Sequence, residues 1–245
     1  MNTRRLRWWT AVIVLVTVAA VLLGVRLTAR AVHRLTNATT VTTTTTTTLT
    51  VAVKQTLSAP ARLTSSKMSL NARAVAVPLI IEIPAIAVRS HVLAVGMTKA
   101  HAMAAPEGGA NSPNWGDTFW YRGSSVPGAS GTATIAGHID DAFGRYAVFG
   151  RLSSLVRGDQ IIIRNSKTGS VERFVVTSTH AYTLTQSKTR PVLNLIYGSG
   201  PPRGLQPQPS KDGRAHLSLV TCSGTWDTSI HTHNERLVVT AVRVS

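Results

Sequence analysis

Residues 216–222 read His-Leu-Ser-Leu-Val-Thr-Cys, an apolar alternation that ends in the single cysteine of the chain. Such an alternation is typical of a β-strand with one buried face. Ser223 and Gly224 follow at once, so the strand opens into a loop directly after Cys222. A side chain at a strand end is held rigidly and stays within reach of a substrate. The stretch therefore predicts a β-rich fold and a candidate nucleophile.

The rest of the C-terminal part has the same texture. Short β-branched and apolar runs are separated by clusters of Gly, Pro, Asn and Asp, which favour turns. Helical periodicity is poor, and one short helix is expected within 143–155. Eight short strands in residues 75–245 predict an all-β fold, either a closed barrel or a sandwich. We expect the strands at 79–83, 91–95, 118–121, 132–138, 160–164, 173–179, 216–222 and 237–242.

The N-terminal part differs in composition. Residues 1–74 hold ten basic side chains and no acidic one, so +10 of the net charge of +16 lies there. Residues 8–25 carry no charge, and a helix of that length is close to the roughly 30 Å of a bilayer core. Arg4, Arg5 and Arg7 precede this run, which predicts a cytoplasmic N-terminus and an exported C-terminal part.

The expected organisation is a basic cytoplasmic tail at 1–7, a transmembrane anchor at 8–27, a Thr-rich extracellular linker at 28–74 and a folded domain at 75–245. This predicts a single-pass protein of the plasma membrane. A cleavable signal peptide is the alternative, because residues 29–31 read Ala-Arg-Ala. The linker contains seven consecutive threonines at 42–48 and is expected to be a disordered stalk.

A sequence pI near 11.4 also raises the question of a nucleic-acid partner. The excess charge lies mainly beside the apolar segment, where basic residues serve membrane topology and attract anionic lipid. Zinc-finger and RNA-binding spacings are missing from the sequence. We therefore predict no nucleic-acid partner.

Two further polar residues stand at the ends of expected strands. His138 closes the run at 132–137, and Arg236 begins the run at 237–239. A thiolate attacks a carbonyl, a histidine accepts and returns a proton, and a guanidinium stabilises an oxyanion. The three residue types together suit acyl transfer if one end of the barrel collects them. From spacing alone, each of the three has a structural explanation as well, a lone buried thiol being a small hydrophobe.

The segments around these residues resemble the sortases, a family of bacterial cysteine transpeptidases. They read Thr-Ile-Ala-Gly-His at 134–138, Leu-Val-Thr-Cys-Ser-Gly at 219–224 and Arg-Leu-Val-Val at 236–239. The sortase motif Thr-Leu-x-Thr-Cys appears at 218–222 with Ser218 in place of the first threonine. The similarity extends over 78–244 and is closest to the single-domain classes E and F.

The resemblance implies a closed eight-stranded β-barrel with short helices, here preceded by the anchor and stalk. It implies that Cys222 attacks the Thr–Gly bond of a signal similar to Leu-Pro-x-Thr-Gly and forms a thioacyl enzyme. The implied partners are secreted proteins that carry this signal at their C-terminus and an amine of a peptidoglycan precursor. His138 would transfer protons, Arg236 would hold substrate and oxyanion, and Thr221 would help to position substrate. No cofactor or metal is implied.

Two alternatives remain open at this point. An L,D-transpeptidase carries Ser-x-Gly-Cys, whereas here Thr221 precedes Cys222 and Ser223-Gly224 follow it, which argues against that class. The other alternative is a non-catalytic, membrane-tethered β-domain that binds cell-wall polymer and has an inert thiol.

Other polar residues give weaker signals. His231 and His233 could form half of a metal site, but no further ligand pattern accompanies them. Asp140 and Asp141 follow His138 and are expected to be solvated turn residues rather than partners of its ring.

Overall fold

A computed structural model describes residues 73–99, 102–198 and 207–244. The tail and anchor expected at 1–7 and 8–27 lie outside the described residues, as does nearly all of the linker expected at 28–74. Within the described ranges, no helix is long and apolar enough to cross a membrane.

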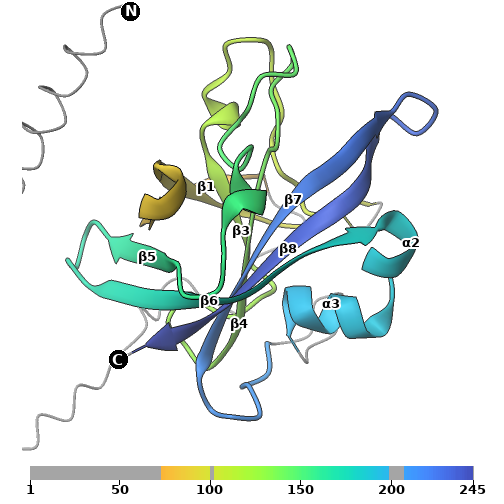
Figure 1. Cartoon of the computed structure of the whole chain (residues 1–245). Helices are drawn as coiled ribbons and strands as arrows, with labels where there is room; N and C mark the ends of the chain where they lie inside the picture. Colours follow the sequence, from red (N-terminus) through yellow and green to blue (C-terminus); the bar gives the residue numbers. More distant parts are fainter. Residues whose placement is uncertain (1–72, 100–101, 199–206, 245) are drawn as a thin grey trace, which may run out of the picture. The chain divides into compact units, whose positions relative to one another are not determined.

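Eight strands close into a barrel in the order β1-β2-β3-β4-β7-β8-β6-β5, which confirms the expected architecture (Figure 1). Every strand expected from the sequence is present, and all but β3 and β4 are longer than expected. The expectation of a loop directly after Cys222 is wrong, because β7 continues to Asp227. The strands are β1 (Val75–Ile83), β2 (Val88–Val95), β3 (Thr118–Tyr121), β4 (Gly131–Gly137), β5 (Gln160–Asn165), β6 (Val171–Thr183), β7 (Ala215–Asp227) and β8 (Thr232–Val244).

The core follows from the two-residue period of the strands. In β7, Leu217 and Leu219 point into the barrel and are almost completely buried. Their partners in β8 include Val239 and Ala241, which belong to the same core cluster. Burying each such aliphatic side chain contributes about 1.5–3 kcal/mol, apart from the smaller alanine. Val220 and Cys222 have the opposite parity and therefore lie on the outer face of β7.

The helix expected within 143–155 is wrong apart from one 3-10 turn, η3 (Leu152–Ser154). Gly144 has a φ of +72° and ends a tight turn, which interrupts any helix there. Two further 3-10 turns are η1 (Pro84–Ile86) and η2 (Pro113–Trp115). The resemblance implies short helices, and the structure contains two whose positions the sequence did not indicate: α2 (Leu184–Ser187) and α3 (Arg190–Tyr197).

Helix α3 covers part of the outer face of the barrel. Val192 and Ile196, four residues apart, are buried against Val238 of β8, and Val220 of β7 packs beside them. The helix also contacts β4. Helix α3 therefore lies on three adjacent strands, β4, β7 and β8. The residues that follow Val220 continue along one of these strands, β7.

Candidate active site

Cys222 and Arg236 face each other across two strands. They are Cα partners in the antiparallel β7–β8 ladder. Directly opposed residues have Cβ atoms about 4.5–5.5 Å apart and project from the same face of the sheet. That face is the outer one, because the neighbouring Thr221 and Leu237 are buried on the inside. The Cys222 side chain is half-buried and its thiol is free.

His138 stands at the matching end of the next strand. The parallel β4–β7 ladder pairs Ala136 with Val220, and two residues further along each chain are His138 and Cys222. His138 directly follows the last residue of β4. The barrel topology thus brings the three residues expected from the sequence to one level on three adjacent strands.

The His138 ring is clamped on two sides. Its Nε2 lies 2.9 Å from the carbonyl oxygen of Pro106. Because a carbonyl only accepts, Nε2 is the protonated nitrogen and Nδ1 is left for proton exchange. The ring also meets Trp115 and Phe119 edge-on, with centroid distances of 4.8 and 5.4 Å. This arrangement fixes the tautomer and the orientation of the imidazole.

The loop between β2 and β3 delivers the Pro106 carbonyl and is braced by its own side chains. Asn114 Nδ2 donates to the Glu107 carbonyl at 2.8 Å, and Trp115 Nε1 donates to the Gly109 carbonyl at 2.9 Å. Sequence reasoning missed this partner of His138, because a backbone carbonyl leaves no mark on residue type.

The Arg236 guanidinium is held against the first residues of β8. Its Nη1 donates to the carbonyls of His233 and Glu235, at 2.8 and 2.7 Å, and its Nη2 donates to Thr232 Oγ1 at 3.0 Å. A guanidinium has five N–H donors. Within the described part of the chain, the other two have no hydrogen-bond partner, so the group is fixed and can still donate to an incoming oxygen.

Thr221 occupies a different environment from the one a substrate contact needs. Its side chain is 3% exposed and lies on the inner face of β7, opposite to Cys222. Its Oγ1 has no hydrogen-bond partner among the described residues. The expected role in substrate positioning stays a prediction, and this burial does not favour direct contact.

Two neutral phenols lie on the outer face near α3. The rings of Tyr121 and Tyr197 meet edge-on at 5.4 Å. Burial, with a smaller contribution from Tyr121, raises the pKa of Tyr197 to about 12. Tyr197 therefore stays protonated over the whole neutral range, and this part of the face carries apolar rings without charge.

The two aspartates after His138 behave differently from each other. Asp141 is a turn residue, as expected: it accepts from the backbone N–H of Phe143 and Arg145, and its hydrogen bond with the Arg145 guanidinium lowers its pKa. Asp140 instead lies with Oδ2 3.4 Å from Nε2 of His233. The expectation of a plain solvated turn is therefore wrong for Asp140.

The possible half-site of His231 and His233 gains no further ligand. Within the described residues, no group of three His, Cys, Asp or Glu side chains is arranged to hold a metal ion. The His233 ring is buried and meets Trp226 edge-on at 5.3 Å.

Comparison with known proteins places the chain in a family. The model of the sortase domain matches residues 81–244. No curated protein matches the sequence. Similar solved structures include three sortases. They are sortase A from Corynebacterium diphtheriae, lid mutant (20% identity, TM-score 0.47, 71% of this chain and 73% of that chain), sortase C-1 from Actinomyces oris (18%, 0.44, 68% and 73%) and sortase A from Listeria monocytogenes (20%, 0.45, 69% and 88%).

The family match spans about two thirds of the chain and includes β4, β7 and β8. The chain therefore belongs to the sortase family, whose members are cysteine transpeptidases.

Proposed function

We propose that this sortase cleaves a C-terminal sorting signal similar to Leu-Pro-x-Thr-Gly between Thr and Gly, and joins the protein to an amine of a peptidoglycan precursor. One observation carries the proposal: Cys222 and Arg236 are cross-strand partners on the outer face, with His138 at the same level of the adjacent strand. A nucleophile, a proton donor and a fixed cation at one place suit acyl transfer.

The proposed first half-reaction uses each residue once. The Cys222 thiolate attacks the threonine carbonyl carbon, and the negative charge that forms on the oxygen is stabilised by the two remaining N–H donors of Arg236. The protonated His138 ring gives a proton to the glycine nitrogen as the C–N bond breaks. The products are a thioester on Cys222 and a released glycine amine.

The second half-reaction reverses these roles. The acceptor amine attacks the thioester carbonyl, and His138 takes the proton that the amine loses. The C–S bond breaks, the Cys222 thiolate is restored, and a new amide joins threonine to the acceptor. Arg236 again stabilises the oxyanion between these two events.

The cellular setting is proposed from the sequence. An uncleaved anchor at 8–27 and a linker at 28–74 would hold the catalytic domain outside the plasma membrane, near secreted substrates and wall precursors. Membership of sortase class E or F stays a prediction from the sequence. The role of Thr221 in positioning substrate also stays a prediction.

Covalent trapping tests the proposal. The full-length chain in detergent is incubated with a peptide that contains the sorting signal, and the intact mass is measured. We expect an adduct equal to the acyl fragment, lost in Cys222→Ala and absent with a scrambled peptide. Added triglycine should discharge the adduct as a new amide. A chain that forms no adduct and cleaves no sorting peptide would instead support the non-catalytic wall-binding alternative.

A further inference from the structure

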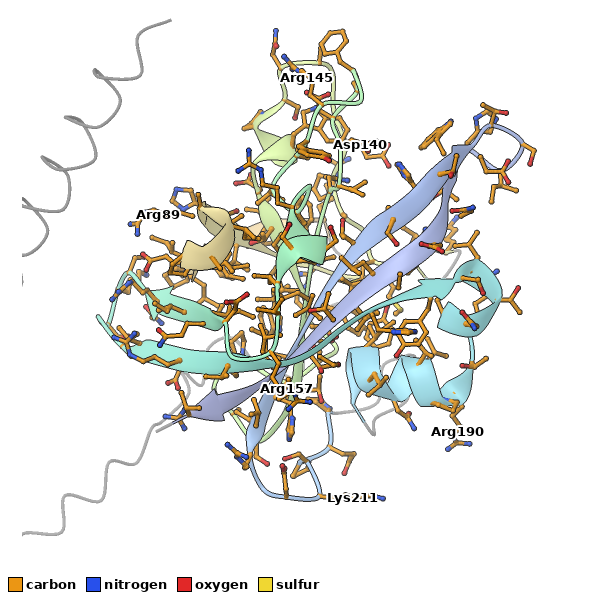
Figure 2. The ribbon with its side chains drawn as sticks, in the orientation of Figure 1. Arg89, Asp140, Arg145, Arg157, Arg190 and Lys211 are labelled. Atoms are coloured by element: carbon orange, nitrogen blue, oxygen red, sulfur yellow. The ribbon has the colours of Figure 1, made fainter. Side chains whose placement is uncertain are left out.

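His233 connects the β7–β8 hairpin to the loop that follows His138. The His233 side chain is 9% exposed, although it lies near the turn of the hairpin. Its Nε2 is 3.4 Å from Oδ2 of Asp140, whose side chain is 33% exposed. Figure 2 shows Asp140 at the end of the barrel toward which the β7–β8 hairpin extends. Within the described residues, this side-chain contact joins the hairpin to the β4–η3 loop.

The backbone of the same residue holds Arg236. The His233 carbonyl accepts from Nη1 of Arg236 at 2.8 Å, beside the acceptors supplied by Glu235 and Thr232. His233 is the member of this acceptor set whose side chain is anchored in a different segment. His233 therefore links the loop after His138, through its ring, to the Arg236 guanidinium, through its carbonyl oxygen.

The hairpin needs such an anchor at this point. The β7–β8 register shifts between Ser223 and Trp226, and Gly224 has a φ of +77°. The ladder is thus interrupted between the Ser223–Glu235 and Trp226–His233 pairs, so the residues that hold Arg236 lie on both sides of an irregularity. A displacement of about 1 Å at a reacting group is enough to lower a rate about 100-fold.

We propose that Asp140 and His233 are positioning residues, which act through the first residues of β8, Thr232–Glu235, to hold Arg236 at the distance and angle that the oxyanion requires. The inference rests on the proposed function, because it concerns the rate of acyl transfer. The contact of 3.4 Å is longer than the 2.7–2.9 Å of a strong charge-assisted hydrogen bond. The pair therefore affects orientation more than it affects the stability of the fold.

A double-mutant cycle on the full-length chain in detergent tests the pair. Asp140→Asn, His233→Gln and the double variant are compared with wild type for kcat and KM in transpeptidation of a sorting peptide. We expect each single variant to lower kcat about 10-fold with KM changed less than twofold. The double variant should be no slower than the slower single variant, because the two residues act as one unit. Asp140→Glu keeps a carboxylate and should retain more activity than Asp140→Asn.

The chain contains a matched control. His216 and Asp212 form another histidine–aspartate pair, with Nε2 3.0 Å from Oδ1, near the opposite end of β7. The cycle built from Asp212→Asn and His216→Gln should leave kcat within twofold of wild type. Unfolding temperatures measured on all variants separate positioning from a loss of fold.

The outcomes distinguish the two proposals. Additive losses of kcat, equal losses in the control cycle, or losses that follow the unfolding temperature would overturn the positioning role while wild type remains active. A wild-type chain that forms no adduct on Cys222 would overturn the proposed function, and the positioning role would fall with it.

Discussion

For Thr221, the effect of the hydroxyl on the stability of the fold and its role toward substrate can be measured separately. Its hydroxyl is buried and has no partner among the described residues. A buried hydroxyl without a hydrogen bond costs about 1–3 kcal/mol, and valine has nearly the same shape. We expect Thr221→Val to leave the free energy of unfolding unchanged or to raise it by up to about 1 kcal/mol, measured by denaturant titration.

The same variant also reports on function. Normal turnover of a sorting peptide would limit Thr221 to a structural role. A large loss of turnover in a chain of normal stability would instead show that the hydroxyl serves the reaction. Clear destabilisation would mean that the hydroxyl has a hydrogen-bond partner in solution, and it would contradict the stability prediction.

His138 directly follows β4, Arg236 lies on the outer face of β8, and both are only partly buried, so we expect their alanine variants to fold. Removal of a proton-transfer group or an oxyanion donor lowers a rate by about 100-fold or more. We expect kcat/KM for a sorting peptide to fall by at least that factor in His138→Ala and in Arg236→Ala. Arg236→Lys should also be slow, because one ammonium cannot reproduce the contacts of both Nη atoms.

Arg190 supplies the control for that comparison. It begins α3, is exposed, and in Figure 2 points away from the barrel. Arg190→Ala should stay within twofold of wild type. Near-normal rates in His138→Ala or Arg236→Ala would remove that residue from the catalytic set.

At the scale of elements, the end of β4 depends on a glycine. A Cβ atom on Gly137 would lie 2.6 Å from Cδ2 of Phe149 and 2.8 Å from Cγ1 of Val148. Phe149 is almost completely buried and cannot move into solvent. We expect Gly137→Ala to destabilise the chain by about 1–3 kcal/mol and to lower turnover, because His138 is the next residue.

Gly109 is the matched control for that substitution. It lies in the β2–β3 loop, and an added Cβ there meets no atom within 4 Å. Gly109→Ala should change neither the free energy of unfolding nor turnover. A Gly137→Ala chain as stable as wild type would show that Phe149 and Val148 repack without cost.

Local sequence patterns predicted the strands and missed the helices. The two-residue alternation of β7 and β8 can be read from neighbouring positions alone. Helices α2 and α3 are only four and eight residues long, so they are too short to show a clear helical period of apolar residues. Better signals were present: the capping box of Thr183 and Gln186, and Pro191 in the first turn of α3.

The parts of the candidate site also differ in how far the sequence can predict them. Cys222, His138 and Arg236 stand out by residue type in or beside β-type runs, so sequence could single them out, and the ladders set them level on adjacent strands. The acceptor for His138 is a backbone carbonyl 32 residues away, which no residue type marks. The contact between Asp140 and His233 likewise depends on how the hairpin folds over the β4–η3 loop, and tertiary packing alone decides that.

At the scale of the whole molecule, closure of the barrel makes the site possible. β4 and β7 are neighbours although α2, α3 and two other strands separate them in sequence. The parallel β4–β7 ladder sets His138 level with Cys222, and the antiparallel β7–β8 ladder sets Arg236 opposite it. Two registers, each fixed by the buried alternation of its strands, therefore define the geometry of the site.

The orientation of the whole chain across a membrane can be tested with its single cysteine. The basic residues before the apolar segment at 8–25 predict a cytoplasmic N-terminus and an exported Cys222. A membrane-impermeant maleimide applied to intact cells should label Cys222, which is only partly buried. In a chain that carries both Cys222→Ala and Asn2→Cys, labelling should occur only after lysis. Labelling of residue 2 in intact cells, or of Cys222 only after lysis, would reverse the proposed topology and separate the enzyme from secreted substrates.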